Sequence, residues 1–337
     1  MLIKDCCIIN PTKKSILKEI NYIDTSSVHD GHLVSIQHLK DNFPSRAQRK
    51  VDVHDILISS VRPNLKHNYY VKKGIYNCVA STGFIQIRCD ANIVNPRYIY
   101  YLLTCKKQIE TYTKVADSSQ TTFPTFNKDV IETIEVLHLD IITQQHIVDS
   151  IGSVDDAIEK NEEMIEKIEK YGLELYQFMI SKEYNEVIIN SLNVKYGVSI
   201  PANQREIGKY PLFASNGIAD YINLFNSSNT IIFGCRGTVG NVYYCKDKNF
   251  VLNTAFYIES KEQFGNLYFA LKHNNGLKLY ATGAAQPQIT IENIQNVKIK
   301  VPTNNKLNSI LYYIYKVQNK NNILKQIKNL LLSKYFD

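Results

Sequence analysis

Two arginines, Arg62 and Arg236, occupy the same place in two similar stretches of the chain. Arg62 ends the run Asp55-Ile-Leu-Ile-Ser-Ser-Val-Arg62, and Arg236 ends the run Asn229-Thr-Ile-Ile-Phe-Gly-Cys-Arg236. A guanidinium group at the end of an apolar strand, beside a turn, can contact phosphate oxygens or pair with the edge of a guanine base. A structural salt bridge explains the two arginines equally well, so both interpretations stay open.

Basic and aromatic side chains follow both arginines, and a polar loop with Gln lies further along each half. Lys, His and Tyr suit contact with a phosphate backbone, and Gln can pair with adenine through two hydrogen bonds. The candidates for DNA contact are Ser60, Arg62, Lys66, His67, Tyr69, Lys72, Ser118, Ser119, Gln120 and Thr121 in the first half, and Arg236, Tyr243, Lys246, Gln286 and Gln288 in the second. For the basic and aromatic residues around the arginines, a plain surface position is the alternative.

Motifs for catalysis or metal binding are absent from the sequence. It lacks the Asn-Pro-Pro-aromatic segment with which an adenine methyltransferase holds its target amino group. The run Gly234-Cys-Arg-Gly-Thr-Val-Gly240 lacks the Gly-Lys-Ser/Thr ending of a phosphate-binding loop and fits a hairpin turn better. Seven cysteines without a CxxC pair predict reduced thiols and no metal site. We therefore expect a binding protein without catalytic residues, metal or cofactor.

The two arginines belong to an internal repeat that runs through most of the chain. The other matches, all in the same order, are Tyr69–Lys72 with Tyr243–Lys246, Ser81–Phe84 with Asn253–Phe256, Tyr98–Leu103 with Asn266–Leu271, and Phe123–Ile131 with Gln286–Ile294. Short β-branched and aromatic runs bounded by Gly, Asn, Pro or Asp predict strands in each half. The segments Tyr98–Gln108 and Leu267–Leu279 predict one helix each.

Two proline-free stretches alternate apolar residues at intervals of three and four, which is the seam pattern of a coiled coil. The predicted seam residues are Ile151, Val154, Ile158, Asn161, Ile165, Ile168 and Leu175 in the first stretch, and Ile310, Tyr313, Val317, Lys320, Leu324, Ile327 and Leu331 in the second. The polar pair Asn161 and Lys320 suits a register marker in an antiparallel helix pair. A simple packing defect is the open alternative.

These patterns predict an α+β protein with a pseudo-twofold internal repeat, in which two long antiparallel coiled-coil helices separate two globular mixed α/β domains. The predicted domains are residues 1–142 and 183–303, and the predicted helices are 143–182 and 304–337. At about 1.5 Å per residue the first helix is roughly 58 Å long, which exceeds a DNA turn of about 34 Å. The helices are therefore expected to set the distance between two contact sites.

Charge and hydropathy narrow the class of protein. The formal charge of +7 is compatible with a polyanionic partner but does not require one. The sequence has no run of about 18 apolar residues and no apolar core of a signal peptide near its start. We expect a soluble cytoplasmic protein that does not bind a membrane.

Together, the motifs resemble those of type I restriction–modification specificity subunits. The segments that carry the resemblance are Asp55–Arg62, Ala80–Phe84, Asn95–Leu102 and Gln144–Val148 in the first half, and Tyr210–Ile218, Ile232–Gly240 and Asn253–Phe256 in the second. The resemblance implies two target-recognition domains, each of which reads one half of a split, asymmetric site in double-stranded DNA. It also implies two adenine-N6 methyltransferase subunits as partners, which restriction subunits can join. S-adenosylmethionine, ATP and Mg²⁺ would belong to those partners.

Some segments depart from the repeat. Residues 1–50 do not match residues 183–228, so the two halves are expected to read different DNA sequences. The second helix also lacks the Gln-Gln-His-Ile start of the first and begins with Asn304-Asn-Lys-Leu307. The competing hypothesis is a coiled-coil scaffold that binds proteins and does not read DNA, and an enzyme ranks third.

Overall fold

The computed structural model describes residues 1–11, 18–29, 31–118, 124–259, 262–273, 275–283 and 287–337. The chain divides into two compact units: unit 1 comprises Met1–Ala157 with Leu324–Asp337, and unit 2 comprises Ile158–Ile323. Two long helices, α5 (Ile141–Ile180) and α8 (Lys306–Phe336), contribute to both units. Their bounds lie close to the predicted 143–182 and 304–337, but each compact unit includes part of both helices.

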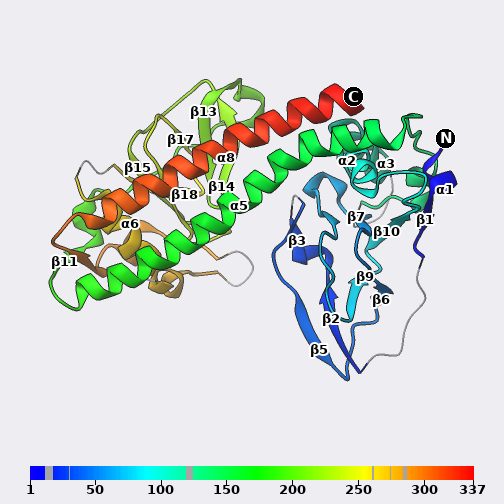
Figure 1. Cartoon of the computed structure of the whole chain (residues 1–337). Helices are drawn as coiled ribbons and strands as arrows, with labels where there is room; N and C mark the ends of the chain where they lie inside the picture. The colour runs from blue at the N-terminus through cyan, green and yellow to red at the C-terminus, as the bar shows by residue number, and fades with distance from the viewer. Residues whose placement is uncertain (12–17, 30, 119–123, 260–261, 274, 284–286) are drawn as a thin grey trace. The chain divides into compact units, whose positions relative to one another are not determined.

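Unit 1 is built on two four-stranded sheets (Figure 1). The first sheet is antiparallel, with the order β1 (Cys7–Ile9), β10 (Phe84–Cys89), β7 (Ile56–Ser59) and β8 (Asn68–Tyr70). The second has the order β5 (Gln37–Lys40), β2 (Glu19–Ile23), β9 (Cys78–Ser81) and β6 (Ala47–Lys50), and β2 is parallel to β9. The remaining elements are the pair β3 (Val28–His29) and β4 (His32–Leu33), helices α1 (Ile3–Cys6), α2 (Pro96–Thr104), α3 (Lys106–Asp117) and α4 (Lys128–Glu132), and the 3₁₀ turns η1 (Thr25–Ser27) and η2 (Pro63–Leu65).

Unit 2 repeats this plan, but its mixed sheet has three strands where that of unit 1 has four. Its antiparallel sheet has the order β12 (Lys195–Tyr196), β18 (Ala255–Glu259), β15 (Thr230–Gly234) and β16 (Val242–Cys245). Its mixed sheet has the order β14 (Gly217–Ile222), β13 (Ile207–Ala214) and β17 (Phe250–Val251). The remaining elements are the pair β11 (Tyr184–Ile188) and β19 (Lys298–Pro302), helices α6 (Phe264–His273) and α7 (Ile291–Ile294), and the 3₁₀ turns η3 (Ile189–Leu192), η4 (Ala202–Gln204) and η5 (Asn275–Tyr280).

The repeat extends into the segments whose sequences do not match. In unit 1, β2 pairs antiparallel with β5 and parallel with β9. In unit 2, β13 pairs antiparallel with β14 and parallel with β17. Residues 1–50 and 183–228 therefore contribute strands of the same topology, although their sequences differ. Strand pairing tolerates this divergence because main-chain groups make the hydrogen bonds.

The single helix predicted for Tyr98–Gln108 is wrong, because the chain leaves the helical conformation at Cys105. Asn95 caps α2, since its Oδ1 accepts hydrogen bonds from the backbone amides of Arg97 and Tyr98 at 2.9 and 3.3 Å. Cys105, with φ −64° and ψ 161°, ends α2 and precedes α3. In unit 2 the segment predicted as one helix likewise consists of α6 followed by the 3₁₀ turn η5.

The fold class is the predicted one, but part of the seam predicted for α8 is exposed. Tyr313 and Ile327 are 50% and 40% exposed, and Lys320 is also exposed. The buried residues of this helix are Leu307, Leu311, Ile314, Tyr315, Val317, Asn321, Leu332 and Phe336. Of the predicted seam, Val317 is buried and Ile310 and Leu331 pack partly against the cores. Leu311, Ile314 and Asn321 each lie one residue after a predicted position, and one residue rotates a helix by about 100°.

Asn161 and Asn321 form the polar pair in the seam of unit 2. The two side chains are 6% and 4% exposed, and Asn161 Nδ2 donates a hydrogen bond of 2.7 Å to Asn321 Oδ1. Asn321 Nδ2 donates to the carbonyl of Ile158 at 3.3 Å. The predicted partner Lys320 is therefore replaced by its neighbour. A satisfied amide pair fits a register marker better than a packing defect.

Candidate nucleic-acid interface

Arg62 and Arg236 lie at equivalent strand ends, and each is held against a proline-containing segment. In unit 1 the backbone amide of Arg62 donates to the carbonyl of Pro124 at 3.0 Å, and that of Phe126 donates to the carbonyl of Ser60 at 3.1 Å. In unit 2 the amide of Gly237 donates to Pro287 at 3.1 Å, and that of Ile289 donates to Cys235 at 2.7 Å. We call these two places the arginine edges: residues 60–66 with 124–126, and residues 235–237 with 287–289.

The arginine edge of unit 2 brings two predicted DNA contacts together. Arg236 Nε donates a hydrogen bond of 3.1 Å to Gln288 Oε1, and the two residues also form an isolated β-bridge. Arg236 is exposed and Gln288 is half-buried. A hydrogen bond to Nε restricts rotation of the guanidinium, and a restricted guanidinium recognises a base or phosphate at lower entropic cost.

The arginine edge of unit 1 contains a strained turn. Arg62 (φ 47°) and Lys66 (φ 53°) both have left-handed backbone conformations and flank the 3₁₀ turn η2. Non-glycine residues rarely adopt positive φ, and such strain is often found at functional sites. Both side chains are exposed, so the turn presents two cations at the end of the β7–β8 hairpin.

The predicted contacts Ser60, His67 and Tyr69 have structural partners in unit 1. Ser60 Oγ donates to the carbonyl of Gly83 at 2.9 Å. His67 Nδ1 is within hydrogen-bonding distance of the carbonyl of Thr25, and Tyr69 packs against an apolar cluster. These side chains support the turn that carries Arg62. Their contact with DNA stays a prediction.

Lys72 and Lys246 lie far from the arginine edges, contrary to the grouping expected from the sequence. In the antiparallel β7–β8 hairpin Ile58 faces Asn68 and Ile56 faces Tyr70, so Lys72 follows the end opposite to Arg62. Lys72 Nζ lies 3.2 Å from Asp156 Oδ1 on α5. Lys246 Nζ lies 4.4 Å from the centre of the Tyr312 ring on α8. Both lysines attach their sheet to a long helix, and their contact with DNA stays a prediction.

Tyr243, another predicted contact, is half-buried in unit 2. Its hydroxyl accepts a hydrogen bond of 3.2 Å from Asn241 Nδ2, and its ring centre lies 6.2 Å from that of Phe213. Burial raises the pKa of Tyr243, and the hydrogen bond from Asn241 opposes that rise. The residue therefore packs between strands and is not on the arginine edge.

Several predicted contacts lie outside the described residues, namely Ser119, Gln120, Thr121 and Gln286. Ser118 is described, is exposed and follows α3, and its Oγ donates to the carbonyl of Val115 at 2.6 Å. In the described part of the chain no group of three or more His, Cys, Asp or Glu side chains is placed to hold a metal ion. None of the described helices is long and apolar enough to cross a membrane.

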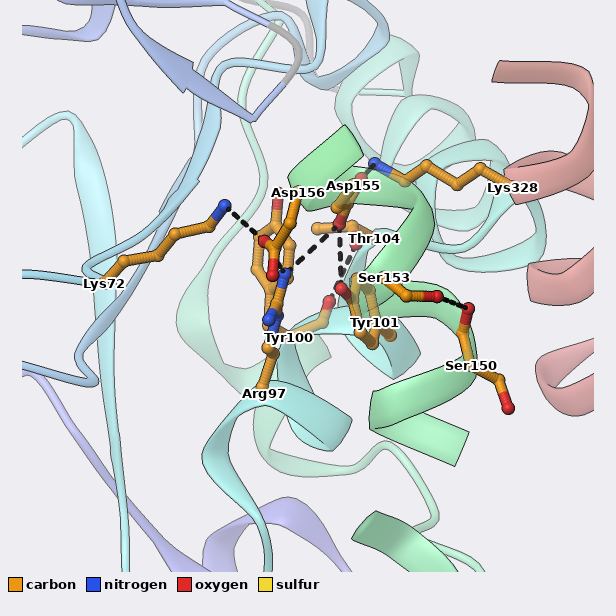
Figure 2. Close-up of polar contacts among 10 residues, drawn as sticks. All are labelled: Lys72, Arg97, Tyr100, Tyr101, Thr104, Ser150, Ser153, Asp155, Asp156 and Lys328. Carbon is orange, nitrogen blue, oxygen red and sulfur yellow. Dashed lines mark hydrogen bonds and ion pairs between the residues drawn. The ribbon is translucent and has the colours of Figure 1, made fainter. Parts of the chain in front are cut away.

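A charged cluster in unit 1, which sequence reasoning missed, joins α2 and α8 to α5 (Figure 2). Arg97 lies 3.0 Å from Asp156, and Lys328 lies 2.7 Å from Asp155. Tyr101 Oη donates to Asp155 Oδ2 at 2.8 Å. Burial would raise the pKa of Asp156, but hydrogen bonds and charge from Arg97 and Lys72 lower it overall.

In the sequence, the acidic pair Asp155-Asp156 looks like part of the solvent-exposed face of a helix. The sequence signal that could have indicated this charged cluster is the position of Arg97 within the Asn95–Leu102 motif. Unit 2 has a related contact, in which Tyr268 Oη donates to Glu169 at 2.8 Å and Lys272 lies 2.7 Å from the same carboxylate. Both units therefore fasten a short helix to α5 through a tyrosine and an acid.

A second missed group is the buried carboxylate of Asp55 at the start of β7. Asp55 is fully buried, and Arg88 of β10 donates to its two oxygens from Nε and Nη2, both at 2.7 Å. Gln86 Nε2 donates to the same carboxylate at 2.8 Å. The hydrogen bond to Asp55 raises the pKa of Arg88. This ion pair fixes β7, and with it the strand end that leads to Arg62.

Comparison with known proteins now places the chain. The sequence profile of the family described as "Type I restriction modification DNA specificity domain" matches residues 4–170 and 188–333, which include most of both units. The chain belongs to this family. The family resemblance inferred from the motifs is thereby confirmed.

Relatives of this specificity-domain chain agree with the assignment. The "Type I restriction enzyme HindI specificity subunit" of Haemophilus influenzae is 31% identical over 158 residues, which is 46% of this chain and 34% of that protein. The chain thus matches about a third of the length of this curated relative. The S subunit of a type I restriction-modification system from M. genitalium is 16% identical, with a TM-score of 0.54 over 100% of this chain and 95% of that one. This likeness shows a shared fold.

The HsdS subunit from Thermoanaerobacter tengcongensis also covers the specificity-domain chain. It is 17% identical, with a TM-score of 0.45 over 100% of this chain and 95% of that one.

Proposed function

We propose that this specificity-domain chain recognises a split, asymmetric site in double-stranded DNA, and that each unit reads one half-site through its arginine edge. The observation that carries the proposal is the repetition of the strand end around Arg62 and Arg236 on two units of the same topology. Equivalent frames with different side chains suit two different half-sites. Reading a palindrome would require two similar surfaces.

Base contact is the more specific role for the arginines. Arg236, held by Gln288, can present its guanidinium to a guanine edge, and Arg62 can do so from its turn. Lys66 beside Arg62 suits a phosphate contact that sets affinity and not sequence. The proposal therefore separates one base-reading arginine per unit from the cations around it.

The proposed partners are two adenine-N6 methyltransferase subunits, which restriction subunits join. In that assembly α5 and α8 set the gap between the half-sites and dock the methyltransferases. The partners would supply S-adenosylmethionine chemistry and the use of ATP and Mg²⁺, and this chain would supply DNA recognition without catalysis. Membership of the specificity-domain family supports this division.

Substitution of each arginine tests base readout. Arg62→Ala should weaken binding roughly 10- to 100-fold on DNA that retains the first half-site, and should leave binding to unrelated DNA unchanged. Arg236→Ala should do the same for the second half-site. Lys72→Ala is the matched control, because Lys72 lies at the other end of the hairpin and pairs with Asp156. Equal losses of affinity for specific and for unrelated DNA would contradict base readout and would indicate that the arginines contact phosphates.

Insertion into α5 tests the spacer. Four residues added after Glu159 should change the preferred gap between the half-sites in a complex with the methyltransferase. An unchanged gap would contradict the spacer role. The scaffold hypothesis predicts that the same complex protects no split DNA motif at all.

A further inference from the structure

Three cysteine sulfurs converge where β1 meets β10 in unit 1. Cys7 and Cys89 are register partners on these antiparallel strands, and their Sγ atoms lie 3.3 Å apart. Cys6, the last residue of α1, places its Sγ 3.8 Å from that of Cys7. The arginine edge and the charged cluster on α5 use none of these thiols.

The strand register favours bond formation between Cys7 and Cys89. The backbone amide of Asp90 donates to the carbonyl of Cys6 at 2.9 Å, so Cys7 and Cys89 form a non-hydrogen-bonded pair. In such pairs the side chains of opposite residues approach most closely. A disulfide has an S–S distance of about 2.05 Å, so a side-chain movement of roughly 1 Å would close the bond.

The surroundings assign different roles to the two thiols. Cys89 is partly exposed, whereas Cys7 and Cys6 are only 8% and 2% exposed. Cys7 donates its S–H to the sulfur of Cys89. The hydrogen bond to Cys89 and burial raise the pKa of Cys7 far above its ordinary value. Burial also raises the pKa of Cys6, to about 12. Reagents in solvent therefore meet Cys89 first.

We propose that Cys7 and Cys89 form a reversible oxidation site at which a hydroperoxide converts the two thiols into a cross-strand disulfide. The Cys89 thiolate attacks one peroxide oxygen, the O–O bond breaks, and the products are a sulfenic acid on Cys89 and an alcohol or water. Cys7 sulfur then attacks Cys89 sulfur, the S–O bond breaks, and the hydroxide leaves as water with the Cys7 proton. Two thiols lose two electrons and the peroxide gains them.

The disulfide would fasten the edge strand β1 to the sheet that carries Arg62. β1 is three residues long and pairs only with β10 among the described strands. The bond would also close a loop from residue 7 to residue 89 that contains the whole β7–β8 hairpin. A dithiol reductant restores the two thiols by exchange.

The test treats the full, reduced chain with a small excess of hydrogen peroxide and maps its peptides by mass spectrometry without reduction. The expected product is one peptide pair joined through Cys7 and Cys89, which dithiothreitol separates. Cys6→Ser should give the same product. Cys7→Ser should instead accumulate a sulfenic acid at Cys89 that a cyclic 1,3-dione traps. Cys245→Ser, which removes a buried thiol of unit 2, is the matched control and should behave as the wild type.

Three results would overturn the proposal. One is a bond from Cys6 to either neighbour in place of the Cys7–Cys89 bond. Another is conversion of Cys89 to sulfinic or sulfonic acid in the wild type without pairing. The third is an unchanged number of free thiols after treatment. The wild-type peptide map decides among these results even where a serine variant fails to fold.

Discussion

In unit 1 the strand β7 leads into a strained turn that carries Arg62, whereas in unit 2 the equivalent strand β15 leads to Arg236, which is hydrogen-bonded to Gln288. The sheets behind these edges have the same strand order. The mixed sheets differ, since β13 and β14 have eight and six residues where β2 and β5 have five and four. A shared frame fixes where each arginine lies, and the local turn chemistry fixes how it is held.

Substitutions at the start of β7 and at the start of β15 are expected to give the largest difference between the two units. Asp55→Ala should destabilise unit 1 by about 3 kcal/mol, because it removes a buried carboxylate and leaves the Arg88 guanidinium without its bidentate partner. The counterpart Asn229 is uncharged, accepts a hydrogen bond of 2.7 Å from Tyr244 and has a φ of 50°. Asn229→Gly keeps that φ accessible and should cost about 1 kcal/mol.

Hydrogen exchange measured by mass spectrometry checks both variants. Loss of protection should concentrate in β7 and β10 for Asp55→Ala and should be much smaller in β15 for Asn229→Gly. Equal losses of protection in both units would mean that the Asp55–Arg88 ion pair does not stabilise β7 more than Asn229 stabilises β15.

The polar pair in the helix seam gives the next largest effect. Asn321→Ala should destabilise unit 2 by about 2 kcal/mol, because it leaves the buried amide of Asn161 without its partner. Lys320→Ala is the matched control and should change stability by less than about 0.5 kcal/mol, since Lys320 is exposed. Denaturant unfolding measures both. A larger loss of stability for Lys320→Ala than for Asn321→Ala would support the seam position predicted from the sequence.

Substitution of two glycines of α5 tests how closely this helix is packed in unit 1 and in unit 2. A Cβ at Gly172 would lie 2.3 Å from the Phe269 ring, whereas a Cβ at Gly152 would lie 2.9 Å from the end of the flexible Arg97 side chain. Gly172→Ala should cost about 1–2 kcal/mol through overpacking. Gly152→Ala should be nearly neutral, because Arg97 can move and alanine favours a helix by about 1 kcal/mol. Thermal unfolding that gives equal losses would contradict the close contact at Gly172.

The smallest expected effect is that of acid pH on the stability of unit 1. The folded pKa of Asp156 is lowered from its ordinary 3.8, so its ion pairs with Arg97 and Lys72 stabilise fully above that value. The stabilisation is lost as pH falls through the folded pKa. Asp156→Asn should therefore flatten part of the acid-induced loss of protection in α2. Identical acid profiles for variant and wild type would remove Asp156 from this role.

The sequence was sufficient to predict the strand ends at Arg62 and Arg236, because apolar runs of equal length lead to both. It was also sufficient for the two long helices. The partners of Lys72 and Lys246 were missed, although the antiparallel hairpin already separates Lys72 from Arg62. The register of α8 could not be chosen from spacing, because the stripe through Tyr313 and Ile327 is as apolar as the buried one and only packing distinguishes them.

The most direct test of the central claim is to map the DNA sites methylated by a complex of this chain with the proposed methyltransferase subunits, for the wild type and for the Arg62→Ala and Arg236→Ala variants. The account predicts a split, asymmetric motif with a constant gap, in which each variant relaxes the bases of one half-site only. A contiguous or palindromic motif, or relaxation of both half-sites by a single arginine variant, would contradict it.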